Sequence, residues 1–264
     1  MIEVMVLHCA HWTPSPEETM ALLGILPASD RERIRKFHFE ADRKRSLAAC
    51  LLTRLLIRRM LPQLPPSDIA IERTEHGRPF LRNAPQGFDF NLSHHGDFCI
   101  IVGCLQSRVG VDVMKVELNA NETADKFLDI FRDFQVTPHE WRQIEACRAP
   151  EDPSWSRLHA FFRLWCLKEA YTKTLGLGLG LDFKTIEFKV RDGVWSGRDG
   201  LVEAFDEDVS VSTNGVLQSG WYFHVGYLDT LHPFVIAVEN KDLMQGEDCL
   251  LFEKVLSMSV EDFK

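Results

Sequence analysis

The pattern of hydrophobic and polar positions changes its period along the chain and predicts both strands and helices. Apolar and polar residues alternate from Phe88 to Ser93, with Asp89, Asn91 and Ser93 on the polar positions. Because successive side chains of a strand point to opposite faces, we expect a strand here with one polar and one aromatic face. Further strands are predicted at short apolar runs: residues 1–12, Ile69–Ile71, Phe98–Leu105, Val109–Val116, Thr185–Val190, Val209–Ser212, Trp221–Tyr227 and Phe234–Glu239.

Apolar residues at spacings of three and four predict helices between these strands. Residues 30–61 carry such a pattern, and a second helical block begins near Thr123. The segment Thr137–Glu140 has the pattern of a capping box, with proline at the first helical position. A last helix is expected after Pro153 and should end at Gly176. This order indicates an α+β fold rather than alternating βαβ units.

The length and composition are those of an ordinary globular protein. The 264 residues are 45% hydrophobic and 26% charged, and we expect two α+β subdomains, at 1–116 and 117–264. The formal net charge of −9 disfavours nucleic acid and anionic membranes as partners. No apolar segment approaches the roughly 20 residues of a membrane span. Seven cysteines without a CxxC pair argue against a disulfide framework and favour a reducing, cytoplasmic location.

Asp112 is a carboxylate within an apolar strand. The period of two sends Val109, Val111 and Val113 to one face, and Gly110 and Asp112 to the other. A buried carboxylate is costly unless it is paired, strongly hydrogen-bonded or bound to a metal. Two interpretations stand at this point: a ligand of a metal and phosphate site, or an aspartate that accepts hydrogen bonds from backbone or Arg groups.

Glu169 continues the apolar face of its helix. It lies four residues beyond Trp165 and eleven beyond Leu158, and Lys173 follows four residues later on the same side. The alternative is a surface ion pair of the common i, i+4 type between Glu169 and Lys173. The apolar face on which Glu169 lies favours a functional carboxylate.

Two further segments could bind an anion. Ser93 and His94 follow the strand that begins at Phe88, where a hydroxyl, an imidazole and backbone N–H groups could hold a phosphate. A hydrolase pair is disfavoured because no GxSxG motif or acidic partner accompanies them. Lys and Arg residues also gather between Asp30 and Ser46, although a solvated helix face would have the same composition.

Three motifs, taken in order, resemble those of the Sfp-type 4′-phosphopantetheinyl transferases. They are FNLSH at Phe90–His94, GVDVMK at Gly110–Lys115 and WCLKEAYTK at Trp165–Lys173. The segment Gly77–Leu81 resembles the family's G-K/R-P motif, and Arg31–Phe39 resembles its early basic helix. The resemblance covers about residues 30 to 182 and is nearest to the animal branch that is associated with aminoadipate semialdehyde dehydrogenase and fatty acid synthase.

The resemblance implies both an activity and an architecture. Such an enzyme, a holo-[acyl-carrier-protein] synthase, transfers the 4′-phosphopantetheine group of coenzyme A to a serine of an apo acyl or peptidyl carrier protein. It depends on Mg²⁺ and releases adenosine 3′,5′-bisphosphate. The implied fold is two similar α+β subdomains related by a pseudo-twofold axis, with coenzyme A in the cleft between them and a single chain as the working unit.

The resemblance also implies roles for individual residues. Asp112 and Glu169 would bind Mg²⁺ together with the coenzyme A pyrophosphate, and Glu169 would also take the proton of the carrier serine, with Lys173 beside it. Residues matching the segments that contact coenzyme A are Arg33, Arg73, Thr74, Gly77, Arg78, Asn91, Ser93, His94, Lys168 and Lys173. Met114 stands where many members of the family have a third acid, so we expect water at that metal position.

Two other functions remain compatible with these motifs. One is a non-catalytic protein that binds coenzyme A or a carrier protein, which would not need the Glu169 base. The other is Mg²⁺-dependent hydrolysis of the coenzyme A pyrophosphate, which would release free phosphopantetheine without a carrier. The reaction product separates these functions from the transferase.

Overall fold

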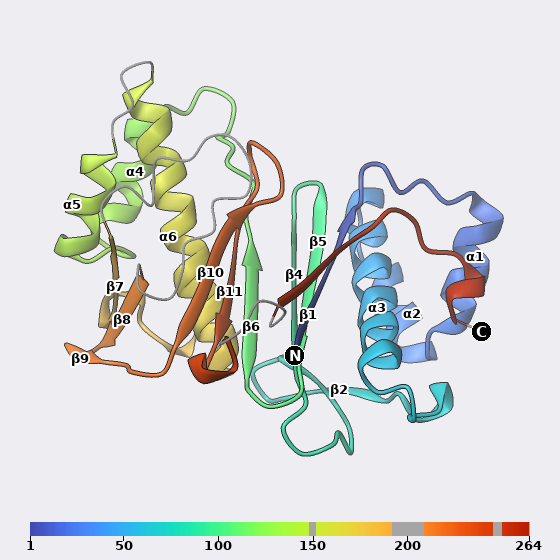
Figure 1. Cartoon of the computed structure of the whole chain (residues 1–264). Helices are drawn as coiled ribbons and strands as arrows, with labels where there is room; N and C mark the ends of the chain where they lie inside the picture. The colour runs from blue at the N-terminus through green and yellow to red at the C-terminus, as the bar shows by residue number, and fades with distance from the viewer. Residues whose placement is uncertain (148–151, 192–208, 245–249, 264) are drawn as a thin grey trace.

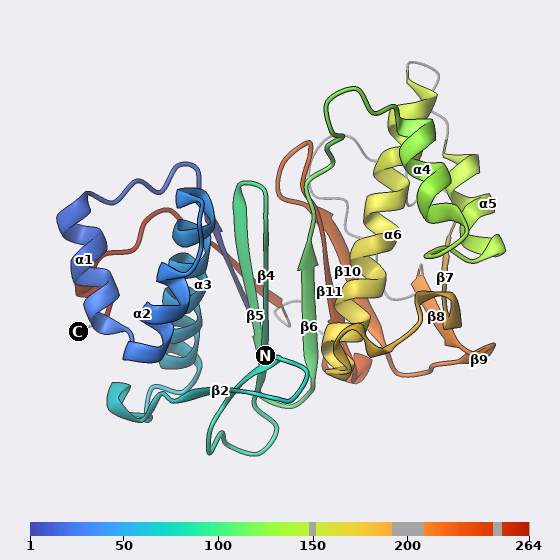
Figure 2. The same cartoon turned by 180° about the vertical axis from the view of Figure 1, so that it is seen from behind.

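Two groups of helices lie on either side of a central set of strands in the computed structural model of the chain (Figures 1 and 2). The structure describes residues 1–147, 152–191, 209–244 and 250–263. This mixture of helices and small sheets is the α+β class expected from the sequence. Among these residues, every helix is too short or too polar to cross a membrane.

The helices largely begin and end where the sequence indicates. They are α1 (Pro16–Ile25), α2 (Ala28–Arg35), α3 (Glu40–Met60), α4 (Ala124–Arg132), α5 (Pro138–Ala146) and α6 (Pro153–Leu175). Thr137 and Glu140 form the expected capping box, and Gly176 ends α6 with a left-handed φ of 72°. The single helix predicted over 30–61 is wrong in one respect, because the chain leaves the helix after Arg35 and re-enters it at Glu40.

The strands of the described residues form four small sheets. They are β1 (Ile2–His8), β2 (Ile71–Arg73), β3 (Pro79–Leu81), β4 (Asp89–His95), β5 (Phe98–Cys104), β6 (Val109–Val113), β7 (Ile186–Val190), β8 (Val209–Thr213), β9 (Val216–Leu217), β10 (Tyr222–Tyr227), β11 (Pro233–Val238) and β12 (Leu250–Val255). Their orders are β12-β1-β5-β4, β10-β11-β6, β2-β3 and β7-β8-β9. Pairing crosses residue 116 twice, since β6 pairs with β11 and β12 pairs with β1. The division into 1–116 and 117–264 stays a prediction.

The first two sheets pack face to face through an apolar layer. Ile100 and Val102 of β5 lie in one buried cluster with Val109, Val111 and Val113 of β6. On the same face of the first sheet, β4 presents polar side chains, because Asn91 and Ser93 are in register with Val102 and Ile100. The polar face predicted between Phe88 and Ser93 is confirmed, and it meets β6.

Side chains of β4, rather than its backbone, satisfy the free edge of β6. Four backbone N–H groups of β6 and its extension donate to side chains twenty positions earlier. The bonds run from Val109 to Asp89 Oδ2 at 2.9 Å, Val111 to Asn91 Oδ1 at 3.0 Å, Val113 to Ser93 Oγ at 3.3 Å and Lys115 to His95 Nδ1 at 2.8 Å. This side-chain ladder joins the two sheets and covers a strand edge that would otherwise be unpaired.

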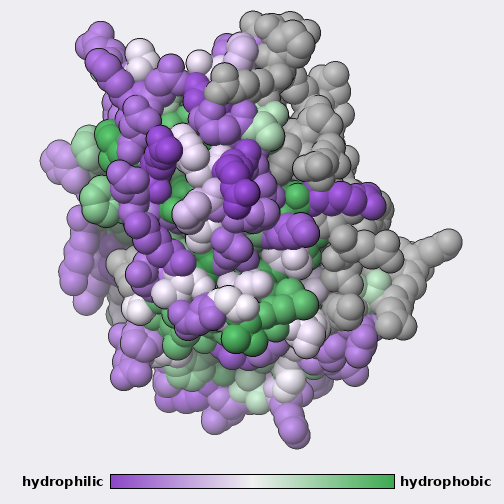
Figure 3. Space-filling view, turned by 90° about the vertical axis from the view of Figure 1, so that its left-hand side faces the viewer, coloured by the Kyte–Doolittle hydropathy of each residue, from purple (hydrophilic) through white to green (hydrophobic). Residues whose placement is uncertain are grey.

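The outer face of the α4–α5 group is mostly hydrophilic (Figure 3). An apolar patch lies low on it, on the side of the β7–β9 sheet, where Val216 and Leu217 are each 64% exposed. Scattered apolar residues of this kind are normal on protein surfaces.

Gly110 allows α6 to lie directly against β6. A Cβ atom at this position would be 2.2 Å from the Ala170 carbonyl oxygen and 2.3 Å from Thr174 Oγ1. Both values are far below contact distance, and one of the two atoms belongs to the backbone of α6. Only glycine here brings the helix close to the strand that carries Asp112.

We predict that Gly110→Ala destabilises the protein by about 1–3 kcal/mol, because strand and helix must separate. Gly24→Ala is the matched control, since Gly24 lies in α1 with open space around its missing Cβ. There the added methyl group should stabilise the helix by up to about 1 kcal/mol. Urea unfolding of both variants measures the difference, and a neutral Gly110→Ala would contradict the close packing.

Candidate active site

Asp112 lies in the middle of β6 and is 4% exposed. Its Oδ1 accepts hydrogen bonds from Ser93 Oγ at 2.9 Å and from Lys173 Nζ at 2.6 Å. Its Oδ2 is buried and has no hydrogen-bond partner among the residues that the structure describes. A buried carboxylate oxygen without a donor is costly, so this atom fits a cation better than it fits the protein alone.

Glu169 and Lys173 approach Asp112 from α6, where they lie one turn apart. Glu169 is partly buried, and burial raises the pKa of its carboxyl; the Asp112 carboxylate acts in the same direction and Lys173 opposes it. Lys173 Nζ also donates to the Val111 carbonyl at 3.2 Å and to Ser93 Oγ at 3.1 Å. The i, i+4 surface pair considered above is therefore replaced by a contact between Lys173 and Asp112.

Two carboxylates and one ammonium thus meet at this point. Asp112 and Glu169 could hold a divalent cation through the free oxygen of Asp112 and the carboxylate of Glu169. No group of three or more His, Cys, Asp or Glu arranged as metal ligands occurs in the described ranges. Mg²⁺ suits such a site because it commonly uses one or two carboxylates and takes its other oxygens from water and phosphate.

His94 lies at the rim of this site, at the end of β4. The residue is exposed. The packing around its ring, followed by the nearby cations of Lys173 and Arg45, nevertheless lowers the pKa of the imidazole. The same cations would attract an anionic ligand. Sequence reasoning noted Arg45 only as part of a basic cluster; here it also anchors the β4–β5 turn by donating to the Gly96 carbonyl at 2.9 Å.

A second group of cations gathers between α2, α3 and the loop after β2. Arg33 on α2 donates to Ser46 Oγ at 3.1 Å and to Cys50 Sγ at 2.9 Å. Partial burial and the charge of Arg33 lower the pKa of Arg73, so the two cations are neighbours. Arg73 Nη1 also donates to the Gly77 carbonyl at 2.7 Å. Arg33 already pairs with Asp30 at 3.3 Å, so the positive charge available to an anion at this partly exposed position comes mainly from Arg73.

The loop between β2 and β3 is a tight turn. The Thr74 N–H donates to the Arg78 carbonyl at 2.9 Å, and the Arg78 N–H donates to Thr74 Oγ1 at 3.1 Å. Gly77 has a φ of 81°, which is the left-handed region that favours glycine. Thr74 and Gly77 therefore shape the turn that carries Arg73.

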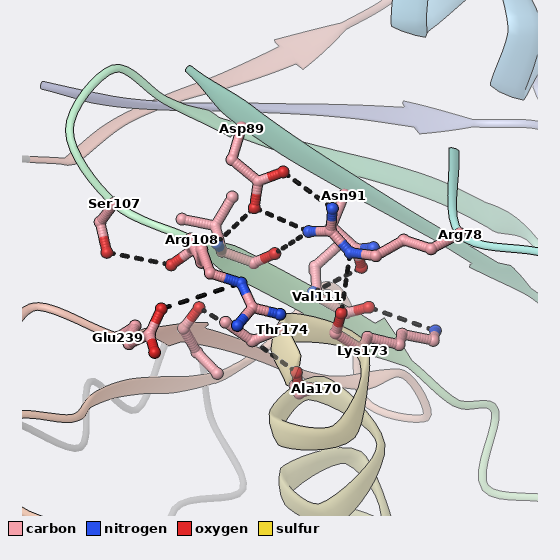
Figure 4. A network of polar contacts seen from close by, with 12 residues as sticks. Arg78, Asp89, Asn91, Ser107, Arg108, Val111, Ala170, Lys173, Thr174 and Glu239 are labelled. Carbon is pink, nitrogen blue, oxygen red and sulfur yellow. Dashed lines mark hydrogen bonds and ion pairs between the residues drawn. The ribbon is translucent and has the colours of Figure 1, made fainter. Parts of the chain in front are cut away.

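Three of the residues that the motifs match to coenzyme A contacts form their bonds within the protein. Asn91 is the second rung of the side-chain ladder and is 3% exposed. The Arg78 guanidinium binds both oxygens of Asp89 (Figure 4). Lys168 belongs to the core of the second half, and the structure does not bring its ammonium to Asp112.

Lys168 and Glu140 form a fully buried ion pair. The Lys168 Nζ lies 2.8 Å from Glu140 Oε2 and donates to the carbonyls of Gln135, Phe183 and Ile186 at 2.7–3.0 Å. Burial raises the pKa of Glu140 and lowers that of Lys168, while their mutual attraction opposes both shifts. Every bond of this ammonium holds α6 to its neighbours, so the burial of Lys168 is explained without any ligand.

Comparison with known proteins connects this geometry to a family. Residues 10–106 match the model of the N-terminal part of 4′-phosphopantetheinyl transferases, and residues 108–212 match the 4′-phosphopantetheinyl transferase superfamily. A phosphopantetheinyl transferase of Thraustochytrium sp. is 33% identical over 244 residues, which are 90% of this chain and 79% of the relative. The chain belongs to the phosphopantetheinyl transferase family.

Several animal relatives bear the name L-aminoadipate-semialdehyde dehydrogenase-phosphopantetheinyl transferase. The protein of Xenopus laevis is 35% identical over 90% of this chain and 76% of its own length. The human protein is 28% identical over 91% of this chain and 75% of its own length. The expected resemblance to this branch of the transferase family is thereby confirmed.

The two matched segments of the transferase family meet at the site. Ser93 and His94 belong to the first segment, and Asp112, Glu169 and Lys173 belong to the second. The side-chain ladder likewise joins residues 89–95 of the first segment to residues 109–115 of the second. The site therefore depends on contacts between two regions that are matched separately.

We predict that Lys168→Met destabilises the protein by about 3–5 kcal/mol, because the Glu140 carboxylate would remain buried without its partner. Urea unfolding measures the loss. The double variant Glu140→Gln with Lys168→Met should lose less than the sum of the two single variants. Strictly additive losses would show that the pair does not interact.

We predict that Glu169→Gln raises the melting temperature of the metal-free protein at pH 8. The folded-state pKa of Glu169 is raised, so the folded protein binds this proton more tightly than the unfolded chain does. The carboxyl therefore costs stability as the pH rises above its ordinary value of 4.5. The gain should shrink as the pH falls toward that value, and thermal melts at several pH values in EDTA follow it.

The control for this prediction is Glu75→Gln, whose carboxylate is 85% exposed. It should leave the melting temperature unchanged at every pH. A Glu169→Gln variant that is no more stable than the parent protein at pH 8 would argue against the electrostatic cost assigned to Glu169.

Proposed function

We propose that this chain transfers the 4′-phosphopantetheine group of coenzyme A to a serine of an apo carrier protein domain, in a Mg²⁺-dependent reaction that releases adenosine 3′,5′-bisphosphate. Family membership supports the reaction class. The observation that carries the proposal is the meeting of Asp112 with Glu169 and Lys173, where one buried carboxylate oxygen has no donor among the residues that the structure describes. A protein that only bound a ligand would not require a base at Glu169.

Asp112 and Glu169 would hold Mg²⁺, with water at the position next to Met114. Bound there, Mg²⁺ would neutralise charge on the pyrophosphate of coenzyme A and on the departing phosphate. Lys173 contacts Asp112 at 2.6 Å and presents a second positive charge to the same phosphates. His94 lies at the rim, where its imidazole would contact the pyrophosphate. The Ser93 hydroxyl is buried and already bonded to Asp112, Lys173 and the Val113 N–H, so its part is to position these groups.

Glu169 is the proposed general base. The carrier serine oxygen attacks the β-phosphorus of coenzyme A, and the bond from that phosphorus to the oxygen of adenosine 3′,5′-bisphosphate breaks. Glu169 takes the hydroxyl proton, directly or through a water molecule. Burial raises the pKa of Glu169 in the metal-free protein, and a bound Mg²⁺ would lower it again. The role as base therefore rests on the position of Glu169 beside Asp112 and Lys173.

The adenosine end of coenzyme A is proposed to lie toward Arg33 and Arg73. These neighbouring cations suit its phosphates, and the Thr74–Gly77 turn lies next to them. In this arrangement coenzyme A occupies a cleft between two similar halves related by a pseudo-twofold axis, and one chain is sufficient. The cysteines of the described residues are free thiols, which fits the proposed cytoplasmic location.

The carrier domain is the proposed protein partner. The names of the Xenopus and human relatives mention L-aminoadipate-semialdehyde dehydrogenase. Carrier domains of that enzyme and of fatty acid synthase are therefore the first substrates to test. A carrier-free reaction would instead indicate hydrolysis of coenzyme A.

We predict that the protein, incubated with coenzyme A, Mg²⁺ and an apo acyl carrier protein, adds one phosphopantetheine to the carrier. Intact-mass spectrometry measures the gain. Glu169→Gln should slow the transfer by about 100-fold or more, as expected for loss of a general base and metal ligand, whereas Asp129→Asn, at an exposed position of α4, should transfer normally.

Several outcomes would overturn the proposal. If coenzyme A binds but no carrier gains mass, the protein is a binding protein. If free phosphopantetheine appears without a carrier, the activity is hydrolysis. If Glu169→Gln transfers at the parental rate, the base has been assigned to the wrong residue.

A further inference from the structure

The Arg78 guanidinium joins three elements at one end of the candidate site (Figure 4). Its Nη1 and Nη2 donate to the two carboxylate oxygens of Asp89 on β4, at 2.8 and 2.7 Å. Its Nε donates to the carbonyl of Lys173 on α6, and Nη2 donates to the carbonyl of Val109 on β6, both at 2.9 Å. The side chain is 13% exposed. Only a planar group with several fixed donors can make these four bonds together.

Each of these bonds ends on a residue that is linked to the site. Lys173 is held at its carbonyl by Arg78 and contacts Asp112 with its ammonium at 2.6 Å. Glu169 lies one turn earlier on the same helix, and Val109 lies three residues before Asp112 on the same strand. Arg78 therefore fixes the end of α6 against the beginning of β6.

Asp89 completes this connection from the first sheet. Its Oδ2 accepts the Val109 N–H at 2.9 Å, so the carboxylate that holds Arg78 is also the first rung of the side-chain ladder. The guanidinium lies at the C-terminal end of α6, where the helix dipole favours a positive charge. Helix, strand and the first sheet are thus tied at one point.

We propose that Arg78 is a positioning residue for the transfer reaction. Acting through its bonds to Asp89, Val109 and Lys173, it sets the separation of Glu169 and Lys173 from Asp112. This role, which rests on the proposed transfer, differs from the contact with coenzyme A that the family motif implies for Arg78. Its four donated bonds are all made within the protein, so the guanidinium has little left for a ligand.

The test replaces the planar group while keeping its charge. Arg78→Lys retains a cation but cannot bind Asp89 through two parallel bonds and reach both carbonyls. We expect kcat to fall about 10- to 100-fold, as for a small misplacement of reacting groups. KM for coenzyme A should change less than about threefold, and the Mg²⁺ concentration for half-maximal rate should rise. Asp89→Asn is the second variant, in case Arg78→Lys does not fold. It should shift the same three quantities in the same direction.

Arg82→Lys is the matched control. Arg82 lies four residues later and forms an exposed ion pair with Glu72 at 3.2 Å, with 57% of its side chain accessible. Its kinetics and metal dependence should match those of the parent protein. A raised KM for coenzyme A with an unchanged kcat in Arg78→Lys would make Arg78 a ligand contact and overturn the proposal. Unchanged kinetics in both Arg78 and Asp89 variants would overturn it as well.

Hydrogen exchange separates this inference from the proposed function. In the metal-free protein, Arg78→Lys should accelerate exchange of the amides of Val109, Val111 and Gly176, and leave the β10–β11 amides unchanged. Uniform acceleration across the protein would show a general stabilising role and overturn the positioning role. If the parent protein transfers nothing, the proposed function fails while exchange still decides whether Arg78 fixes α6 against β6.

Discussion

The free edge of β6 is the constraint on which the arrangement of the two halves depends. Three of its N–H groups, and that of Lys115 just beyond it, would have no partner if β4 did not supply side-chain acceptors. Two of its carbonyls, those of Val109 and Val111, are satisfied by the side chains of Arg78 and Lys173. An unsatisfied buried backbone group costs roughly 1–3 kcal/mol, so this edge strongly favours one way of joining the sheets.

Two buried carboxylates, Glu140 and Asp112, differ in how completely their hydrogen bonds are satisfied, and this difference separates a structural ion pair from the candidate site. Lys168 and Glu140 meet one another and enough backbone groups to saturate their bonding, so this pair holds the second half together. Asp112 is equally buried, yet one of its oxygens has no donor in the described structure. Incomplete satisfaction of a buried charge is expected where a ligand completes the site.

Local signals were sufficient for part of this structure. The alternation at 88–93 predicted the polar face of β4, and capping residues located α5 and α6. The break at Lys36–Phe39 was missed because it does not interrupt the helical spacing, and α1 was missed although Ser15 and Glu18 form a capping box. The pairing of β12 with β1 joins the two ends of the chain and leaves no local pattern. Motif position likewise placed Arg78 and Lys168 near the site but could not show which groups their side chains contact.

The side-chain ladder also separates β4 and β6 more widely than backbone pairing would. Paired strands lie about 4.8 Å apart and direct their side chains above and below the sheet. Because side chains separate β4 from β6, the two strands stand farther apart, and the Ser93 hydroxyl lies between them at the Asp112 carboxylate. The same oxygen accepts the β6 N–H and the Lys173 ammonium while its proton points to Asp112. The Ser93 hydroxyl that joins the sheets therefore also lines the site. A change in how the two halves meet would move the Asp112 carboxylate and the Lys173 ammonium relative to each other.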